Sequence, residues 1–491
     1  MNSALSPMHQ PHIFTVEASE APAPENKRVP FGWKAQAIDA ADSARPTRLN
    51  PAWPTRQPAV SLAKGTAFLR IAIAIDIREE VLVEARLPQS GKTIGRFDIR
   101  YAYALQPFEI AVPGSDLPVV LEQGVSLVMV QGTAPIWILT GAAGEGAADA
   151  LLPHLLLPQE GADRSKLSYF RQLASLGSIQ PFGWMEGCVL DGLADLDAAF
   201  PGAGWDEALL RHLRMFVTDD GGLIYENPRS TPSDHHIYGL EGGLPFAQIA
   251  RLWPEHPLVD MMIQFSLNLP EFDEQKMGGS LTAEGSYTIA YPLAVIAKVR
   301  GRRDLADLAV RHLLLRRTFL ATEQGVRLRF GSKVSEQFHN WARGYAWYML
   351  GLTRAVIALR SGDSSVMPST KLLEEEILRV SRVAISYQRA DGLWSCFVDD
   401  ERIKIDTSGS AGIAAALALG AKSGLLPQEA LRAAERTYEA LWRYVTPDGL
   451  LGGVAQSNRN GEALQRSSYR VISQLGMGLM GQLAAGLGRN R

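Results

Sequence analysis

The sequence predicts a mainly α-helical protein, an (α/α)6 barrel, with an N-terminal β-rich domain. From about Leu151 to the C-terminus, apolar residues recur at three- and four-residue spacing in about twelve segments. Turns rich in Gly and Asp join these segments, which is typical of repeated helical hairpins. A linear solenoid would share this pattern. The chain shows no regular repeat and its loops are uneven, so hairpins closed into a ring are favoured.

Three regions follow one another along the chain: a Pro-rich arm over residues 1–60, a β-rich domain over residues 61–150, and the barrel over residues 151–491. Prolines such as Pro30, Pro46 and Pro51 are expected to break any regular element in the arm. The arm is therefore expected to be disordered or to lie over a partner, and a homo-oligomer would offer it such a surface.

Short β-prone runs separated by Gly, Pro and charged turns predict a small antiparallel sheet or sandwich in the β-rich domain. These runs are 67–77, 81–87, 96–105, 108–112, 125–130 and 136–139. The barrel helices are expected at 167–176, 188–199, 206–217, 244–253, 258–269, 287–299, 304–321, 342–359, 371–387, 409–423, 428–445 and 471–487.

Composition argues against several classes of protein. The formal net charge of −3 and the lack of a basic tract argue against a nucleic-acid partner. No apolar run approaches the roughly 18 residues of a membrane span, and the N-terminus lacks a signal-peptide pattern, so we expect a cytoplasmic protein with no membrane partner. Cys188 and Cys396 are too few for a disulfide framework and are expected to be buried thiols.

Carboxylic acids that precede apolar helices are the candidates for catalysis. Hydrolysis by carboxylic acids uses one acid to donate a proton and can use a second carboxylate to activate water or attack carbon. Asp234 precedes the helix that begins near Leu244, and Glu284 precedes the helix that contains Pro292. Glu284 and Asp234 are therefore the predicted catalytic residues, with Glu186 in reserve.

The segment Trp341-Ala342-Arg343-Gly344-Tyr345-Ala346-Trp347 is suited to binding an anionic sugar. The guanidinium of Arg343 offers two parallel donors to a carboxylate. Trp341 and Trp347 lie six residues apart, so on a helix one is expected to face sugar and the other to pack. The alternative is a buried aromatic helix start with an internally paired Arg343.

Two further segments admit both a structural and a binding role. Asp406, Thr407 and Ser408 are good N-caps for the Ala-rich helix that follows, and Asp406 and Ser408 are also candidates for substrate contact. Asp391-Gly392-Leu393-Trp394 supplies a turn with a residue at positive φ, after which Trp394 either packs in the core or lines a sugar cleft.

These segments resemble motifs of glycoside hydrolase families 88 and 105, the unsaturated glucuronyl and rhamnogalacturonyl hydrolases. The usual forms of the family are close to W-A-R-G-N-G-W and E/D-T-S-G-[ST]-A, and Phe182-Gly183-Trp184 resembles its first barrel segment. The resemblance spans about Phe182 to Leu487. It implies an (α/α)6 barrel and an exo-acting glycosidase that releases a terminal uronic acid, 4,5-unsaturated or saturated, from an oligosaccharide without a cofactor.

The resemblance also implies roles for particular residues. Glu284, followed by Gly285-Ser286-Tyr287, stands where the family has its catalytic aspartate, and Asp234 stands at the position of a second one. Arg343 is expected to bind the uronate carboxylate. Further contacts with the sugar are expected from Trp184, Tyr287, Trp341, Trp347, Trp394, Asp406 and Ser408.

This sequence departs from the family pattern at three places. Glu284 replaces an aspartate and reaches one methylene further, which would displace a proton-donating oxygen. One extra residue precedes Pro292, and Tyr345-Ala346 replaces Asn-Gly. A non-catalytic carbohydrate-binding or scaffold protein on the same barrel is therefore the alternative function.

His235 and His236 suggest either hydrogen bonding to sugar or a structural role. No further His, Cys or carboxylate stands at a ligand spacing from them, so no metal is expected.

Overall fold

The computed structural model describes residues 12–17, 24–42, 45–52, 66–141, 149–157, 166–270, 280–331, 334–362 and 368–490. These residues form two compact units. The first comprises the chain up to Pro181 with two short returns, Pro228–Pro232 and Thr446–Leu450, and the second comprises the rest. The boundary lies beyond the expected position near residue 150, because strand β10 (His154–Leu156) pairs within the sheet of the first unit.

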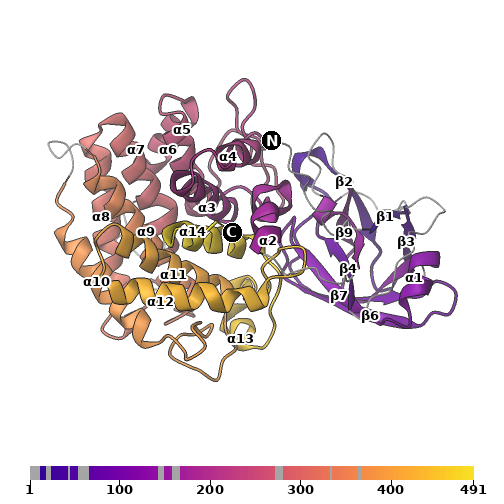
Figure 1. Ribbon diagram of the computed structural model, residues 1–491. Helices are drawn as coiled ribbons and strands as arrows, with labels where there is room; N and C mark the ends of the chain where they lie inside the picture. Colours follow the sequence, from indigo (N-terminus) through magenta and orange to yellow (C-terminus); the bar gives the residue numbers. More distant parts are fainter. Residues whose placement is uncertain are drawn as a thin grey trace. The chain divides into compact units, whose positions relative to one another are not determined.

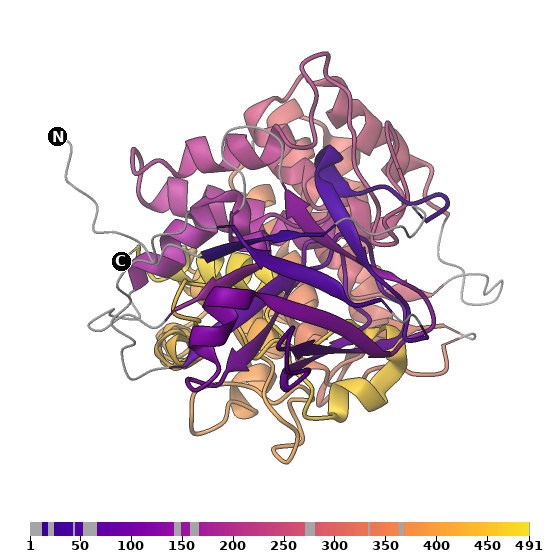
Figure 2. The same cartoon turned by 90° about the vertical axis from the view of Figure 1, so that its right-hand side faces the viewer.

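An eight-stranded sheet with antiparallel pairing dominates the first unit, in the order β6-β5-β8-β3-β1-β10-β4-β7 (Figure 2). Its two outer strands contact each other, because Gly95 on β6 packs against the side chain of Ile110 on β7. The sheet therefore curls on itself. Strands β2 and β9 form a separate pair. An isolated β-bridge between Ile73, just after β4, and Ile138 on β9 connects this pair to the sheet.

The six predicted β-prone runs are confirmed as strands. They are β4 (Ala67–Ala72), β5 (Glu80–Arg86), β6 (Thr93–Arg100), β7 (Pro107–Val112), β8 (Val125–Gln131) and β9 (Ile136–Gly141). Strand β6 ends earlier than expected, because Tyr101 and Leu105 adopt positive φ angles of 48° and 67°. A short helix, α1 (Leu117–Gln123), precedes β8.

The expectation that the arm lacks regular elements was wrong for three segments. Residues His12–Val16, Lys34–Ile38 and Thr47–Pro51 form strands β1, β2 and β3. Their prolines are compatible with this, because Pro46 precedes β3 and Pro51 is its last residue, where a missing N–H costs little. Pro22, Pro54 and Pro58 lie outside the described residues.

The predicted helices are confirmed, with ends that differ by a few residues. They are α2 (Lys166–Ala174), α3 (Trp184–Ala199), α4 (Trp205–Leu213), α5 (Phe246–Leu252), α6 (Pro257–Leu267), α7 (Tyr291–Arg300), α8 (Arg303–Leu320), α9 (Ala342–Arg360), α10 (Lys371–Ser386), α11 (Thr407–Lys422), α12 (Gln428–Leu441) and α14 (Gln474–Gly486). A short α13 (Gly461–Arg466) precedes α14. Short pairings join β11 (Leu281–Thr282) to β14 (Arg329–Phe330) and β12 (Ala321–Thr322) to β13 (Gly325–Val326).

Six helices of the second unit form a closed ring. Consecutive helices in the order α3, α5, α7, α9, α11 and α14 contact each other, and α14 returns to α3 (Figure 1). Each of the first five is followed along the chain by an outer helix that packs on it, from α4 to α12. This alternation of inner and outer helices is the arrangement of an (α/α)6 barrel.

Close backbone approach holds the ring together where α14 crosses α3. A Cβ atom on Gly478 would lie 2.4 Å from the backbone carbon of Cys188. We therefore expect Gly478→Ala to lower the free energy of unfolding by about 1–3 kcal/mol through overpacking. Gly114, around which a Cβ atom would meet nothing, provides the matched control Gly114→Ala. Equal thermal stability of the two variants would contradict this account of the crossing.

The cysteines and the lengths of the helices complete the description of the fold. Cys188 and Cys396 are free, buried thiols, as predicted. No helix among the described residues is long and apolar enough to span a bilayer.

Candidate active site

The N-terminal ends of neighbouring inner helices bring several predicted site residues to one end of the ring. Helices α9 and α11 run parallel, since Gly409 contacts Ala342 at their starts and Gly412 contacts Ala346 one turn later. Helix α14 follows the same direction, because Gly476 lies near Ser408 and Gly486 near Ala418. The segments that lead into these helices therefore share one end of the barrel.

Glu284 lies between strand β11 and a π-helical turn, η5 (Ser286–Ala290), which continues directly into α7. Its side chain is half-buried, and its Oε2 atom has no hydrogen-bond partner among the described residues. Burial raises the pKa of the Glu284 carboxyl above its usual value, while the positive charges of Arg329 and Arg316 act in the opposite direction. Glu284 is thus a carboxyl that holds its proton more tightly than a free glutamate.

A second carboxyl, Glu241, stands beside Glu284. It lies in a short 3-10 helix, η4 (Leu240–Gly243), which packs on η5 so closely that a Cβ atom on Gly243 would lie 2.3 Å from the carbonyl oxygen of Thr288. The Thr288 hydroxyl donates to the Glu284 carbonyl at 3.1 Å. Glu241 as a residue is exposed, but desolvation around its carboxyl and the neighbouring Glu284 carboxylate raise its pKa to about 6.

Glu241 is not among the catalytic residues predicted from the sequence. Leu240-Glu241-Gly242-Gly243 has the composition of a turn, and Asp234 was the carboxylate chosen ahead of the same helix. The signal that could have found it is positional, because Glu241 precedes inner helix α5 much as Glu284 precedes α7.

Arg316 fixes the turn that carries Glu284. Its buried guanidinium donates to the carbonyl oxygens of Thr282 at 2.9 Å and His312 at 3.1 Å, and a Cβ atom on Gly285 would lie 1.8 Å from its Nη2. Burial lowers the pKa of Arg316 to about 10, and the Glu284 charge opposes that decrease. Only glycine at position 285 permits this contact.

Asp234, His235 and His236 lie in a loop that folds back on residues 223–225. Asp234 accepts a hydrogen bond from the backbone N–H of Tyr225 at 3.0 Å, and the backbone N–H of His235 donates to the carbonyl of Leu223 at 2.8 Å. Both histidine side chains are exposed. The carboxyl coupled to Glu284 is Glu241, whereas Asp234 shapes this loop.

Trp341 and Arg343 are buried and bound to the protein. Arg343 is 2% exposed, donates from Nη2 to the carbonyl of Gln456 at 2.6 Å, and lies over the ring of Trp341 at 4.7 Å. The Trp341 indole donates to Gln465 at 3.2 Å. These contacts match the alternative of a buried aromatic helix start with an internally bonded arginine.

Three other aromatic residues form a cluster that includes Tyr287, three residues after Glu284. Tyr287 stacks on Trp347 with ring centroids 6.1 Å apart, and Trp347 meets Trp184 edge-on at 5.5 Å. Tyr287 and Trp347 are buried, whereas Trp184 is partly exposed. Trp184 is therefore the member of this cluster that can reach a ligand without rearrangement.

Asp406 acts as a helix cap, and Trp394 lies in the core. Asp406 Oδ1 accepts hydrogen bonds from the backbone N–H of Ser408 at 3.0 Å, from the Ser408 hydroxyl at 2.7 Å and from the backbone N–H of Ala455 at 3.0 Å. Trp394 is 0% exposed and its indole donates to the carbonyl of Ala384 at 2.7 Å. Asp406 thus has the predicted capping role and Trp394 the predicted role in the core, and Trp394 does not line a cleft in this structure.

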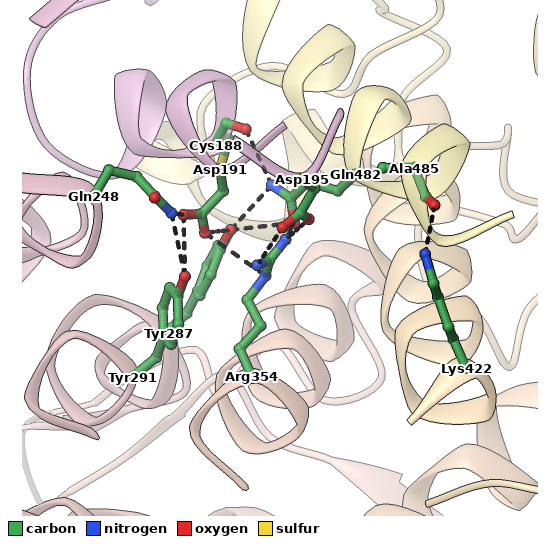
Figure 3. A network of polar contacts seen from close by, with 10 residues as sticks. All are labelled: Cys188, Asp191, Asp195, Gln248, Tyr287, Tyr291, Arg354, Lys422, Gln482 and Ala485. Atoms are coloured by element: carbon green, nitrogen blue, oxygen red, sulfur yellow. Dashed lines mark hydrogen bonds and ion pairs between the residues drawn. The ribbon is translucent and has the colours of Figure 1, made fainter. Parts of the chain in front are cut away.

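A buried polar network fills the ring next to the aromatic cluster (Figure 3). The Tyr287 hydroxyl donates to Asp191 at 2.6 Å, and the Arg354 guanidinium pairs with Asp195 and donates to Gln482 at 2.8 Å. Burial alone would lower the pKa of Arg354, but Asp195 and Asp191 raise it above its usual value. The network ties the inner helices α3, α9 and α14 to the turn that follows Glu284.

Comparisons with known proteins bear on the helical unit. The model of Glycosyl Hydrolase Family 88 matches residues 287–485. The resemblance to glycoside hydrolase families 88 and 105 is thereby confirmed. The match begins three residues after Glu284, so neither Glu284 nor Glu241 lies within it.

Solved structures from these families share the fold. A possible member of family 105 from Salmonella enterica serovar Paratyphi A has a TM-score of 0.55 at 15% identity, over 68% of this chain and 96% of that one. A family 105 glycoside hydrolase from C. acetobutylicum has a TM-score of 0.55 at 18% identity, over 67% and 99%. A family 88 glycosyl hydrolase from Bacteroides vulgatus has a TM-score of 0.51 at 12% identity, over 66% and 99%. No curated protein matches the chain.

Proposed function

We propose that this chain is an exo-acting glycoside hydrolase that releases a terminal uronic acid from an oligosaccharide. The observation that supports the proposal best is the pair of carboxyls, Glu241 and Glu284, each with a raised pKa. Of two carboxyls that share one proton, the protonated one can act as a general acid and the ionised one as the base. Glu241 takes the place that sequence analysis gave to Asp234.

The proposed chemistry assigns one step to each carboxyl. With a 4,5-unsaturated uronide, Glu284 protonates C4 of the enol ether, and Glu241 removes a proton from the water whose oxygen bonds to C5. The resulting hemiketal opens and frees the remaining sugar. With a saturated β-glucuronide, Glu284 would instead protonate the glycosidic oxygen while Glu241 activates water at the anomeric carbon.

Two substrates test the proposal and separate its two forms. The purified chain is incubated with p-nitrophenyl β-glucuronide and, separately, with unsaturated disaccharides made by a polysaccharide lyase. Release of colour supports the saturated route, and loss of the enol-ether absorbance supports the unsaturated route. If neither substrate is hydrolysed but sugar binding is measurable, the proposal is overturned in favour of a carbohydrate-binding protein.

The rate of the proposed reaction should depend on pH. The reaction needs one proton on the pair of carboxyls, carried by Glu284 as the acid while Glu241 is ionised as the base. The pair gives up this last proton as the pH rises past about 6, the raised pKa of Glu241 beside the Glu284 carboxylate, so kcat/KM should fall above that pH. In the residual activity of Glu241→Gln the charge of residue 241 is absent, so the decrease of kcat/KM should move to lower pH. A pH profile identical in wild type and Glu241→Gln would show that the two carboxyls do not titrate together.

A further inference from the structure

Arg329 occupies a place directly beside the segment that carries Glu284. Strand β14, which begins with Arg329, pairs antiparallel with β11, and Arg329 stands opposite Thr282. Thr282 precedes Glu284 by two residues. This strand pair thus places Arg329 next to the segment that carries the proposed acid.

The Arg329 guanidinium is held against an aromatic ring, and no carboxylate of the described residues pairs with it. It lies over the ring of buried Phe338 at 5.1 Å from the centroid, and its side chain is half-buried. Its positive charge acts on both Glu284 and Glu241. Among the described residues, no carboxylate lies within ion-pair distance of Arg329, and no hydrogen bond engages its guanidinium.

Other arginines near the ring are already bonded to groups of the protein, although Nε of Arg343 and Nε of Arg354 have no hydrogen-bond partner among the described residues. Arg354 pairs with Asp195, Arg316 donates to two backbone carbonyls, and Arg343 donates to the carbonyl of Gln456. Arg343, the residue that sequence analysis selected for the uronate, is buried in its own contacts. Arg329 combines contact with an aromatic ring, partial exposure and donors that have no partner among the described residues.

We infer that Arg329 binds the carboxylate of the substrate's terminal uronic acid and thereby selects acidic over neutral sugars. The inference rests on the proposed function. A guanidinium presents two parallel N–H donors that fit a carboxylate, and stacking on an aromatic ring fixes their plane. With the carboxylate on Arg329, C5 of the sugar would lie toward Glu284.

Occupation of Arg329 would also assist the acid. The Arg329 charge favours the ionised form of Glu284, since it acts to lower the pKa of that carboxyl. A bound uronate would neutralise this charge and so favour the protonated form. Neutral sugars would leave Arg329 unpaired and Glu284 more readily ionised, so selectivity would appear in kcat as well as in KM.

The test compares the acid and methyl-ester forms of the same uronide, which differ in charge at one group. Arg329→Met keeps an apolar side chain on Phe338 and removes the charge. Arg329→Lys keeps the charge but lacks the two parallel N–H donors of a guanidinium.

In wild type kcat/KM should favour the acid, and Arg329→Met should reduce that preference by about 10- to 100-fold, which corresponds to the loss of a charge-assisted hydrogen bond. Arg329→Lys should retain part of it. Arg302→Met is the control, since exposed Arg302 pairs with Asp304 at the surface.

The outcomes separate this inference from the proposed function. An unchanged acid-to-ester ratio in a folded, active Arg329→Met variant would overturn the role of Arg329 and leave the hydrolase intact. If wild type hydrolyses neither form, equilibrium binding of glucuronate and glucose decides. Selective binding of glucuronate that Arg329→Met removes would support Arg329 without catalysis, and binding unaffected by the substitution would overturn it.

Discussion

Glu284→Gln should abolish turnover of uronides while leaving sugar binding largely intact. The amide keeps the shape of the carboxyl and cannot donate the required proton, so the loss in kcat should be about 10²- to 10⁴-fold. The substitution should also not destabilise the fold, because it replaces a half-buried carboxyl whose Oε2 has no partner among the described residues. The measurement is kcat with each uronide, together with the Kd of the product.

A matched control strengthens this prediction. Glu255 is also a glutamate, with a side chain 80% exposed and paired to Arg300 at the surface, so Glu255→Gln should retain wild-type kcat. Glu241→Gln should lose activity and keep binding as Glu284→Gln does. Full activity of Glu284→Gln would remove this residue from the mechanism.

Arg354→Met should cause the largest loss of stability. Arg354 is 5% exposed and is the positive partner of the buried carboxylates Asp191 and Asp195. Removal of one member of a buried ion pair leaves charge uncompensated, which typically costs about 3–5 kcal/mol. Urea denaturation followed by circular dichroism measures the free energy of unfolding.

The control for Arg354 lies on the same helix. Arg360 is half-exposed and lies 4.0 Å from Glu374, so Arg360→Met should change stability by less than about 1 kcal/mol. An Arg354→Met variant as stable as Arg360→Met would mean that the network in Figure 3 does not hold the inner helices together.

Much of the fold could be predicted from the sequence because periodicity reports burial. The helices from α2 to α14 and the strands from β4 to β9 follow apolar spacings that the structure reproduces. Strands β1, β2 and β3 could not be predicted in the same way, because short runs between prolines gain their stability from pairing with distant strands. Local sequence does not contain that information.

The candidate site was predicted in part, for reasons that particular residues show. Glu284 was recognised because it precedes an apolar helix. The extra residue before Pro292 also has a structural counterpart, since the π-helical turn Ser286–Ala290 accommodates one more residue per turn than an α-helix. Glu241 and Arg329 were missed because their relation to Glu284 arises from packing of η4 on η5 and pairing of β14 with β11.

The most direct test of the site is a crystal structure of Glu284→Gln with a bound uronide oligosaccharide. The account predicts a terminal sugar between residue 284 and Glu241, at the end of the ring where the inner helices begin. A sugar bound at the other end of the ring, or one that contacts neither residue, would contradict it.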